Sequence, residues 1–164
     1  MASPRLTRLE NDYQALRNRF DGHPNITIEP LGAVPPEHYR ITFNVDSLRL
    51  DPNNRPVVVA STVVDVDLPS GYPREKPHAV AHGEVFHPNF GQYVCIADFW
   101  SPAQSLSDIV VEIGEMLQWQ KYNIQSPLNA IAADWAVKNI DSLPVGKTEL
   151  SRTGPTISIT VKDQ

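Results

Sequence analysis

Apolar residues recur at three- and four-residue spacing over the first twenty or so positions. This spacing places them on one face of an α-helix of about five turns. Ser3 followed by Pro4 is a typical helix start, because the serine hydroxyl can cap the first turn and proline fits the first helical position. Gly22 can take the left-handed conformation that ends a helix. The apolar face of the predicted helix consists of Leu6, Leu9, Tyr13, Leu16 and Phe20.

From Asn25 the pattern changes to short β-branched runs separated by proline, glycine and asparagine. Such runs predict β-strands joined by tight turns. Apolar and polar residues alternate at the end of the third run, which indicates an antiparallel meander with one face toward solvent. The expected strands are residues 26–31, 39–45, 57–68 and 78–81.

The second half of the chain has helical periodicity. Ser105 and Asp108 form a cap with an acid at the positive end of the expected helix, whose apolar face is Leu106, Ile109, Val110, Ile113, Met116 and Leu117. Ser126-Pro127 repeats the start signal of the first helix. We expect the next helix to begin there, with an inward face of Leu128, Ile131, Ala132, Trp135 and Ala136. The final TISITVKDQ alternates like a strand, although a loose tail fits equally.

The order of these elements predicts one α+β domain over residues 1–140, with residues 141–164 as a C-terminal extension. A chain of 164 residues can bury a core without disulfides, and its single cysteine cannot form an internal one. A net charge of −5 argues against nucleic-acid binding. The N-terminus lacks the apolar stretch of a leader, and no run is long enough to cross a membrane, so we expect a cytoplasmic protein with no membrane partner.

Cys95 is the main candidate for chemistry. A lone cysteine between Val94 and Ile96 is often a passive core residue. However, Cys95 lies in an irregular stretch between strand and helix, where functional sites often occur, and polar residues cluster around it: His87, Asn89, Asp98 and Ser101. The histidines 78, 82 and 87 are spaced too irregularly for a zinc site, so we expect no metal.

Five motifs then occur in a characteristic order: LPSGYPREKP, VFHPN, VCI, WSPAQSL and SPLNAIAADWA. In this order the chain resembles the ubiquitin-conjugating enzyme family over residues 1–139. The resemblance implies the family's fold, with an N-terminal helix, a four-stranded antiparallel meander, an active-site loop, and central and C-terminal helices. It also implies that Cys95 is the catalytic cysteine.

The resemblance further implies a relay of acyl groups. An activating enzyme uses ATP to charge ubiquitin or a ubiquitin-like modifier and passes it to Cys95 as a thioester, and an amine of a protein substrate, usually lysine, then accepts it. The chain itself needs no cofactor. Asn89 matches the family asparagine that stabilises the oxyanion or braces the loop, while His87 and Pro88 fix the loop. Trp100 caps the cleft by packing, and Tyr72-Pro73 matches a turn that tends to hold a cis peptide.

Three departures from the family pattern affect this interpretation. Only FGQYV separates Asn89 from Cys95, and only IADF separates Cys95 from Trp100, both shorter than usual. Ser126 stands where the family often has an acid that orients lysine, and Asp98 or the Tyr122-Asn123 loop is a candidate substitute. The trimmed loops look more like a bacterial relative, encoded beside its own activating enzyme and modifier.

Four arginines (5, 8, 17 and 19) occupy the polar side of the first helix, which is either a solvated surface or a docking face for an acidic partner. The resemblance implies that Arg5 and Arg8 contact the activating enzyme. Residues 68–73 and 100–104 resemble the surface that ligases grip, so a ligase is a further partner. Two alternatives remain open: a non-catalytic binding module for a modifier or partner, and a cysteine hydrolase, which would need a histidine beside Cys95.

Overall fold

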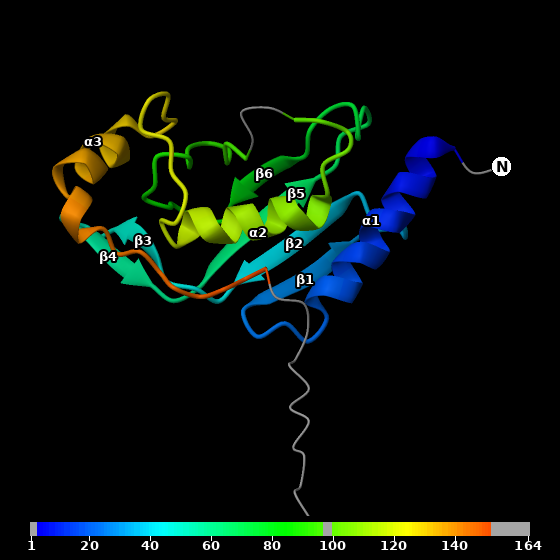
Figure 1. Ribbon diagram of the computed structural model, residues 1–164, viewed down its shortest axis with the longest axis horizontal. Coiled ribbons are helices and arrows are strands. Elements are labelled where there is room, and N and C mark those ends of the chain that lie inside the picture. The colour runs from blue at the N-terminus through cyan, green and yellow to red at the C-terminus, as the bar shows by residue number, and fades with distance from the viewer. Residues whose placement is uncertain (1–2, 97–99, 152–164) are drawn as a thin grey trace, which may run out of the picture.

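The central element is a four-stranded antiparallel sheet in the order β1-β2-β5-β6. The computed structural model describes residues 3–96 and 100–151 (Figure 1). Alternate residues of β2 and β5 are buried, as expected for a sheet with one wet face. The two predicted strands 26–31 and 78–81 are confirmed. The strands of this sheet are β1 Ile26–Leu31, β2 His38–Phe43, β5 Thr62–Asp67 and β6 His78–Ala81.

The predicted strand 57–68 is wrong as a single element. It is split into β4 (Pro56–Val59) and β5, and β4 pairs with an unpredicted strand, β3 (Ser47–Leu50), in a separate two-stranded sheet. The break falls at Ala60-Ser61, the two residues of the 57–64 run that are not β-branched, and no proline, glycine or asparagine marks it as a turn. A buried hydrogen bond of 2.9 Å between the hydroxyls of Ser47 and Thr62 joins the hairpin to the main sheet.

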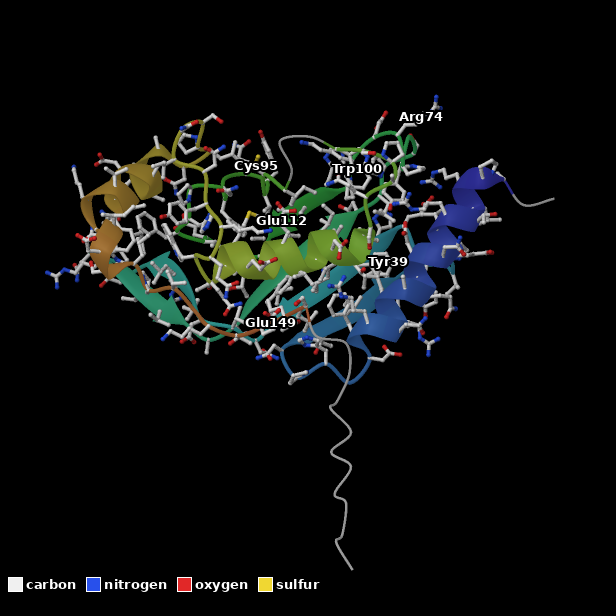
Figure 2. All side chains as sticks on the ribbon, viewed as in Figure 1. Tyr39, Arg74, Cys95, Trp100, Glu112 and Glu149 are labelled. Atoms are coloured by element: carbon white, nitrogen blue, oxygen red, sulfur yellow. The ribbon has the colours of Figure 1, made fainter. Side chains whose placement is uncertain are left out.

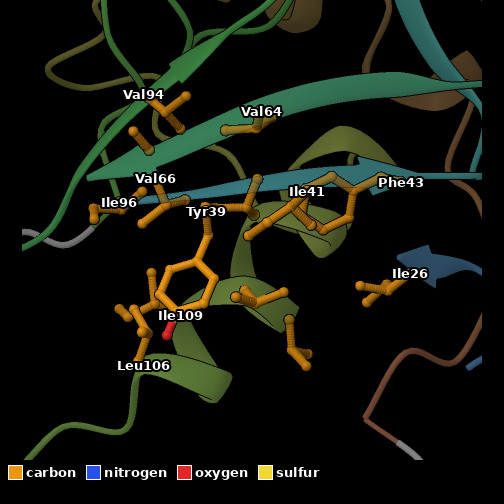
Figure 3. Packing of buried hydrophobic residues seen from close by; sticks show 14 of the residues in the cluster. Ile26, Tyr39, Ile41, Phe43, Val64, Val66, Val94, Ile96, Leu106 and Ile109 are labelled. Atoms are coloured by element: carbon orange, nitrogen blue, oxygen red, sulfur yellow. The ribbon is translucent and has the colours of Figure 1, made fainter. Parts of the chain in front are cut away.

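Two helices cover the inner face of the main sheet. Helix α1 (Pro4–Phe20) begins as predicted, with the Ser3 hydroxyl accepting from the Leu6 N–H. Helix α2 (Leu106–Leu117) begins at the Ser105 cap and buries most of its surface. Figure 3 shows Tyr39, Ile41 and other side chains of the inner face directed at the first turns of α2. The main core lies between these layers.

Helix α3 (Ala130–Lys138) begins three residues later than the Ser126-Pro127 signal predicts. Asn129 is the cap, since its side-chain oxygen accepts from the Ala132 N–H at 3.0 Å. The expected inward positions of Leu128 and Ile131 are also wrong, because these side chains are 38% and 74% exposed. Ala132 and Ala136 are buried as expected, in a second cluster around Trp119.

After a 3-10 turn at Ile140–Ser142, the chain runs back along α2 in extended form. The Gln118 side chain exchanges two hydrogen bonds with the backbone of Thr148, at 3.1 and 2.9 Å. Leu150 is only 1% exposed and packs against Gly114 of α2. Residues 143–151 of the predicted extension therefore seal the core of the domain, whereas the TISITVKDQ run lies outside the described residues. Among the described helices, none is long and apolar enough to cross a membrane.

Candidate active site around Cys95

The His-Pro-Asn segment, residues 87–89, is fixed by hydrogen bonds at each of its residues. The His87 side chain is fully buried. Its Nδ1 accepts from the Asn89 N–H at 3.0 Å, and its Nε2 donates to the Lys121 carbonyl at 3.0 Å. Burial lowers the pKa of His87 to about 4, and the hydrogen bond to the Lys121 carbonyl opposes this only in part. His87 is therefore a neutral structural residue at physiological pH.

Pro88 is also buried, and its carbonyl accepts the N–H groups of both Leu128 and Asn129, at 2.9 and 3.1 Å. These bonds tie residues 128 and 129 to the active-site segment, and the Ser126 hydroxyl accepts from the Asn123 side chain instead of capping a helix. His87 and Pro88 together tie the loop before Cys95 to the connection between α2 and α3. The loop-fixing role of both residues stays a prediction, and these contacts support it.

The Asn89 side chain bridges the same two segments. Its Nδ2 donates to the Cys95 carbonyl at 3.3 Å, and its Oδ1 accepts from the Asn123 N–H at 2.9 Å. The backbone adds a bond of 2.9 Å from the Cys95 N–H to the Asn89 carbonyl. The shortened loop thus places Asn89 as a brace under Cys95, with both ends of its amide in use.

Cys95 itself is a free cysteine and only partly buried. The side chains before and after it, Val94 and Ile96, are 3% and 1% exposed and belong to the main core. The Val94 N–H also donates to the Ala79 carbonyl of β6 at 2.8 Å. Because both neighbours point into the core, the Cys95 side chain is turned to the surface, on the side of α2 that also carries Trp100 (Figure 2).

The environment of the thiol differs from that of a cysteine hydrolase. Both ring nitrogens of His87, the nearest histidine in sequence, are occupied by backbone groups. Among the hydrogen bonds of the described residues, none joins a histidine to the Cys95 sulfur. The described residues likewise contain no group of three His, Cys, Asp or Glu side chains able to hold a metal ion.

Trp100 lies after Cys95 and frames the site from the other side. Its indole N–H donates to the Pro73 carbonyl at 2.7 Å, and its ring packs against Tyr72 at 6.0 Å. The Tyr72-Pro73 peptide is cis, as the resemblance implies. Trp100 therefore packs against the Tyr-Pro turn, and its capping of the cleft stays a prediction.

Ser126 is exposed and belongs to a loop organised by Asn123. The Asn123 side chain accepts from the backbone N–H groups of Gln125 and Ser126 and donates to the Ser126 hydroxyl at 3.3 Å. Since the Asn123 N–H binds Asn89, this loop is connected to Cys95 through a single asparagine. Sequence reasoning named Asn123 only as a loop member. An asparagine just before a turn often accepts hydrogen bonds from the backbone N–H groups that follow it, and this was a visible signal for its role here. Asp98 lies outside the described residues.

The arginines of α1 face the domain rather than an open docking surface. Arg5 donates to the Glu37 carboxylate at 2.5 Å and to the Pro69 carbonyl at 3.0 Å. Arg19 binds Ser107 and Asp108 at the start of α2. Of the four, Arg17 is the exposed one. A solvated face is therefore wrong for Arg5, Arg8 and Arg19, and the contact of Arg5 and Arg8 with an activating enzyme stays a prediction.

Sequence reasoning missed a buried polar residue of this helix. Asp12 is 7% exposed and accepts from the Tyr72 hydroxyl at 2.5 Å and from Arg8 Nε at 2.9 and 3.0 Å. An aspartate four residues after an arginine was a visible signal for this ion pair. The burial of Asp12 was not visible, because it depends on Tyr72, sixty residues away.

Comparisons with known proteins agree with this geometry. A family model described as "Ubiquitin-conjugating enzyme" matches residues 61–143, about half of the chain and including the whole Cys95 region. A similar protein is "Ubiquitin-conjugating enzyme E2 27" of Arabidopsis thaliana, 32% identical over 82 residues, which are 46% of this chain and 42% of that protein. The chain thus matches less than half the length of that relative. The α+β fold, the order of the motifs and the matched family model together show that the chain belongs to the ubiquitin-conjugating enzyme family.

Proposed function

We propose that this chain is a conjugating transferase for ubiquitin or a ubiquitin-like modifier, with Cys95 as the carrier. The Cys95 thiolate attacks the thioester that links the modifier's C-terminal carbonyl to an activating enzyme, and the enzyme's thiol leaves. A substrate amine then attacks the new thioester, an amide bond forms, and the C–S bond breaks to release the Cys95 thiolate. The amine loses a proton to water or a base. A thiol suits both steps because its thiolate is a good nucleophile and a good leaving group.

The outward position of Cys95 is the observation that carries the proposal. A cysteine that only fills the core would be buried like Val94 and Ile96 on either side of it, which are 3% and 1% exposed. Cys95 is instead partly exposed on a backbone held at the segments before and after it. A reactive atom held on a fixed backbone favours transfer, because less orientational freedom is lost in the transition state.

Within this proposal Asn89 positions the Cys95 backbone. The family asparagine is associated with either oxyanion stabilisation or loop bracing, and the two bonds of the Asn89 amide favour bracing here. The predicted acceptor is a lysine amine of a protein substrate. Ser126 contributes a hydroxyl and not a charge, so it can orient the amine only by hydrogen bonding.

The proposed partners are an activating enzyme, which consumes the ATP, a modifier, a protein substrate and, where one is required, a ligase. The chain itself is expected to need no cofactor or metal. Contact with the activating enzyme is expected to involve the α1 side of the domain, near Arg5. Contact with a ligase is expected at residues 68–73 and 100–104.

The test is intact-mass analysis under non-reducing conditions after incubation with ATP and a soluble extract of the native host. We expect an adduct of small-protein mass on the wild type that thiol releases. Cys95→Ser should give an ester that survives thiol and is cleaved by mild alkali, and Cys95→Ala should give no adduct. If the extract charges a known acceptor but the wild type carries no adduct, the non-catalytic binding module becomes the better explanation.

A further inference from the structure

We infer that Arg8, supported by Asp12 and Tyr72, is a positioning residue that fixes residues 100–104, the described segment that follows Cys95 in the chain. This inference rests on the proposed function for its consequence in catalysis, but its structural part can be tested without any modifier. The segment follows Cys95 closely in sequence and contains no helix or strand. Its position therefore depends on bonds to the rest of the domain.

Arg8 supplies most of those bonds. Its Nη2 donates to the Gln104 carbonyl at 2.7 Å, and its Nη1 donates to the Pro102 carbonyl. Residues 101–103 are exposed, so no core packing holds them. The other described ties are the bond from the Trp100 indole to the Pro73 carbonyl and the packing of the Trp100 ring against Tyr72 and the main core. A guanidinium can grip two carbonyls at once because its donors form a planar fork, which a lysine lacks.

The Arg8 side chain is in turn held from below. Its Nε lies 2.9 Å from Asp12 Oδ2, and its Nη2 also donates to the Tyr72 hydroxyl at 3.0 Å. The Tyr72 hydroxyl donates to Asp12 at 2.5 Å, which closes a triangle of three side chains. Burial and the Asp12 carboxylate raise the pKa of Tyr72, so its hydroxyl remains a donor. With all three guanidinium nitrogens in use, Arg8 has one preferred orientation.

This arrangement gives Arg8 a role other than partner binding. Two parts of the chain around the site are held through backbone carbonyls. Asn89 binds the carbonyl of Cys95, and Arg8 binds the carbonyls of Pro102 and Gln104. Loss of the Asn89 bond or of the Arg8 bonds would let part of the backbone around Cys95 move relative to the rest of the domain. A displacement of this kind lowers the rate of transfer without removing any reacting group.

The experiment compares Arg8→Ala and Arg8→Lys with Arg40→Ala as a matched control. Arg40 forms a similar two-bond pair with Asp65, at 3.0 and 3.2 Å, on the main sheet. Amide hydrogen exchange over residues 100–106 is the first readout. We expect exchange to accelerate about tenfold in Arg8→Ala, less in Arg8→Lys, and not in Arg40→Ala, since hydrogen bonds to charged groups carry roughly that factor.

Two further readouts distinguish positioning from general stability. The rate of Cys95 alkylation by iodoacetamide should rise in Arg8→Ala as residues 100–104 loosen. If the wild type forms the thioester, discharge to free lysine should show a limiting rate constant about tenfold lower, with the half-saturating lysine concentration changed by less than about twofold. Tyr72→Phe keeps the carbonyl contacts of Arg8 and should change each readout less, which gives a second variant if Arg8→Ala fails to fold.

Unchanged exchange over residues 100–106 in Arg8→Ala would overturn the inference. Faster exchange over residues 100–106 in Arg8→Ala together with a wild-type rate of discharge to lysine would also overturn it, because the position of this segment would then not affect transfer. A wild type that forms no thioester would instead overturn the proposed function, and exchange and alkylation would still decide the role of Arg8.

Discussion

The buried His87 makes the stability of this domain depend on pH in a way that can be isolated by one substitution. The His87 side chain is 0% exposed, and its ring centroid lies 4.7 Å from that of Trp119, with the two rings tilted. Both ring nitrogens form hydrogen bonds to the backbone. Protonation of Nδ1 would remove its acceptor role toward the Asn89 N–H. The folded state therefore favours the neutral ring, and burial lowers the pKa from 6.5 to about 4.

The size of the effect follows from the two pKa values. Above the unfolded pKa of 6.5 neither state binds the proton, and the full stability is present. As the pH falls below 6.5, the unfolded chain takes up a proton that the folded chain refuses, so stability is lost until the pH reaches about 4. The loss from His87 alone is about 2 kcal/mol between about pH 7 and pH 5, and about 3 kcal/mol over the whole range.

Urea unfolding of the wild type and of His87→Gln at the two pH values measures this loss. Other titrating groups are present in both proteins, so their contributions cancel in the difference of the two pH dependences. We expect His87→Gln to be less stable at about pH 7, by roughly 1–3 kcal/mol, but to lose about 2 kcal/mol less on acidification. Equal losses in both proteins would refute the reasoning. If the variant does not fold, NMR titration of the wild type decides, and a His87 ring that titrates near 6.5 contradicts the burial argument.

Two further predictions concern the brace below Cys95 and the C-terminal seal. Asn89→Ala should accelerate hydrogen exchange of the Asn123 amide and lower the free energy of unfolding by about 1–3 kcal/mol. Asn25→Ala removes a comparable bond to the Asn44 carbonyl and should leave exchange of the Asn123 amide unchanged. Unaltered exchange in Asn89→Ala would exclude the bracing role of Asn89. Gly114→Ala should cost about 1–3 kcal/mol in urea unfolding because its Cβ would overlap Leu150 and lie 3.2 Å from Phe43, and Leu150→Ala should cost about 2–5 kcal/mol. The double variant should lose less than the sum, since the shortened side chain makes room for the new methyl, and strict additivity would contradict the contact.

Local signals predicted the elements that begin and end with capping chemistry. Ser3-Pro4 and Ser105 each start a helix at the expected residue, because a cap acts within one turn and is visible in the sequence. Ser126-Pro127 has the same appearance but does not start a helix. The Ser126 hydroxyl accepts from the Asn123 side chain, and the Leu128 amide binds the Pro88 carbonyl, forty residues earlier in the chain. Such tertiary contacts are not visible locally. The break between β4 and β5 was also missed, since Ala60-Ser61 contains no proline, glycine or asparagine that would mark a turn.

The candidate site divides in the same way. The motifs singled out Cys95 as the candidate nucleophile, which stays a prediction, and His87 and Pro88 make backbone contacts that no local pattern showed. The polar side of α1 was interpreted less well. Helical spacing correctly placed Arg5, Arg8 and Arg19 on related faces of the helix, but their environment depends on the 68–73 turn and on residues 100–108. A helical pattern shows which residues share a face and not what that face contacts.

The side chains that hold the backbone around Cys95 share one property that affects how the sequence can vary. His87, Asn89 and Arg8 all bind main-chain carbonyls, at Lys121, Cys95, Pro102 and Gln104. A carbonyl is present whatever the side chain, so the gripped residues can change without loss of the contact. The gripping side chains have no such freedom, because each must supply donors of defined geometry. The walls of the site can therefore diverge in surface character, and with it in the partners they accept, while the backbone around the thiol keeps one arrangement.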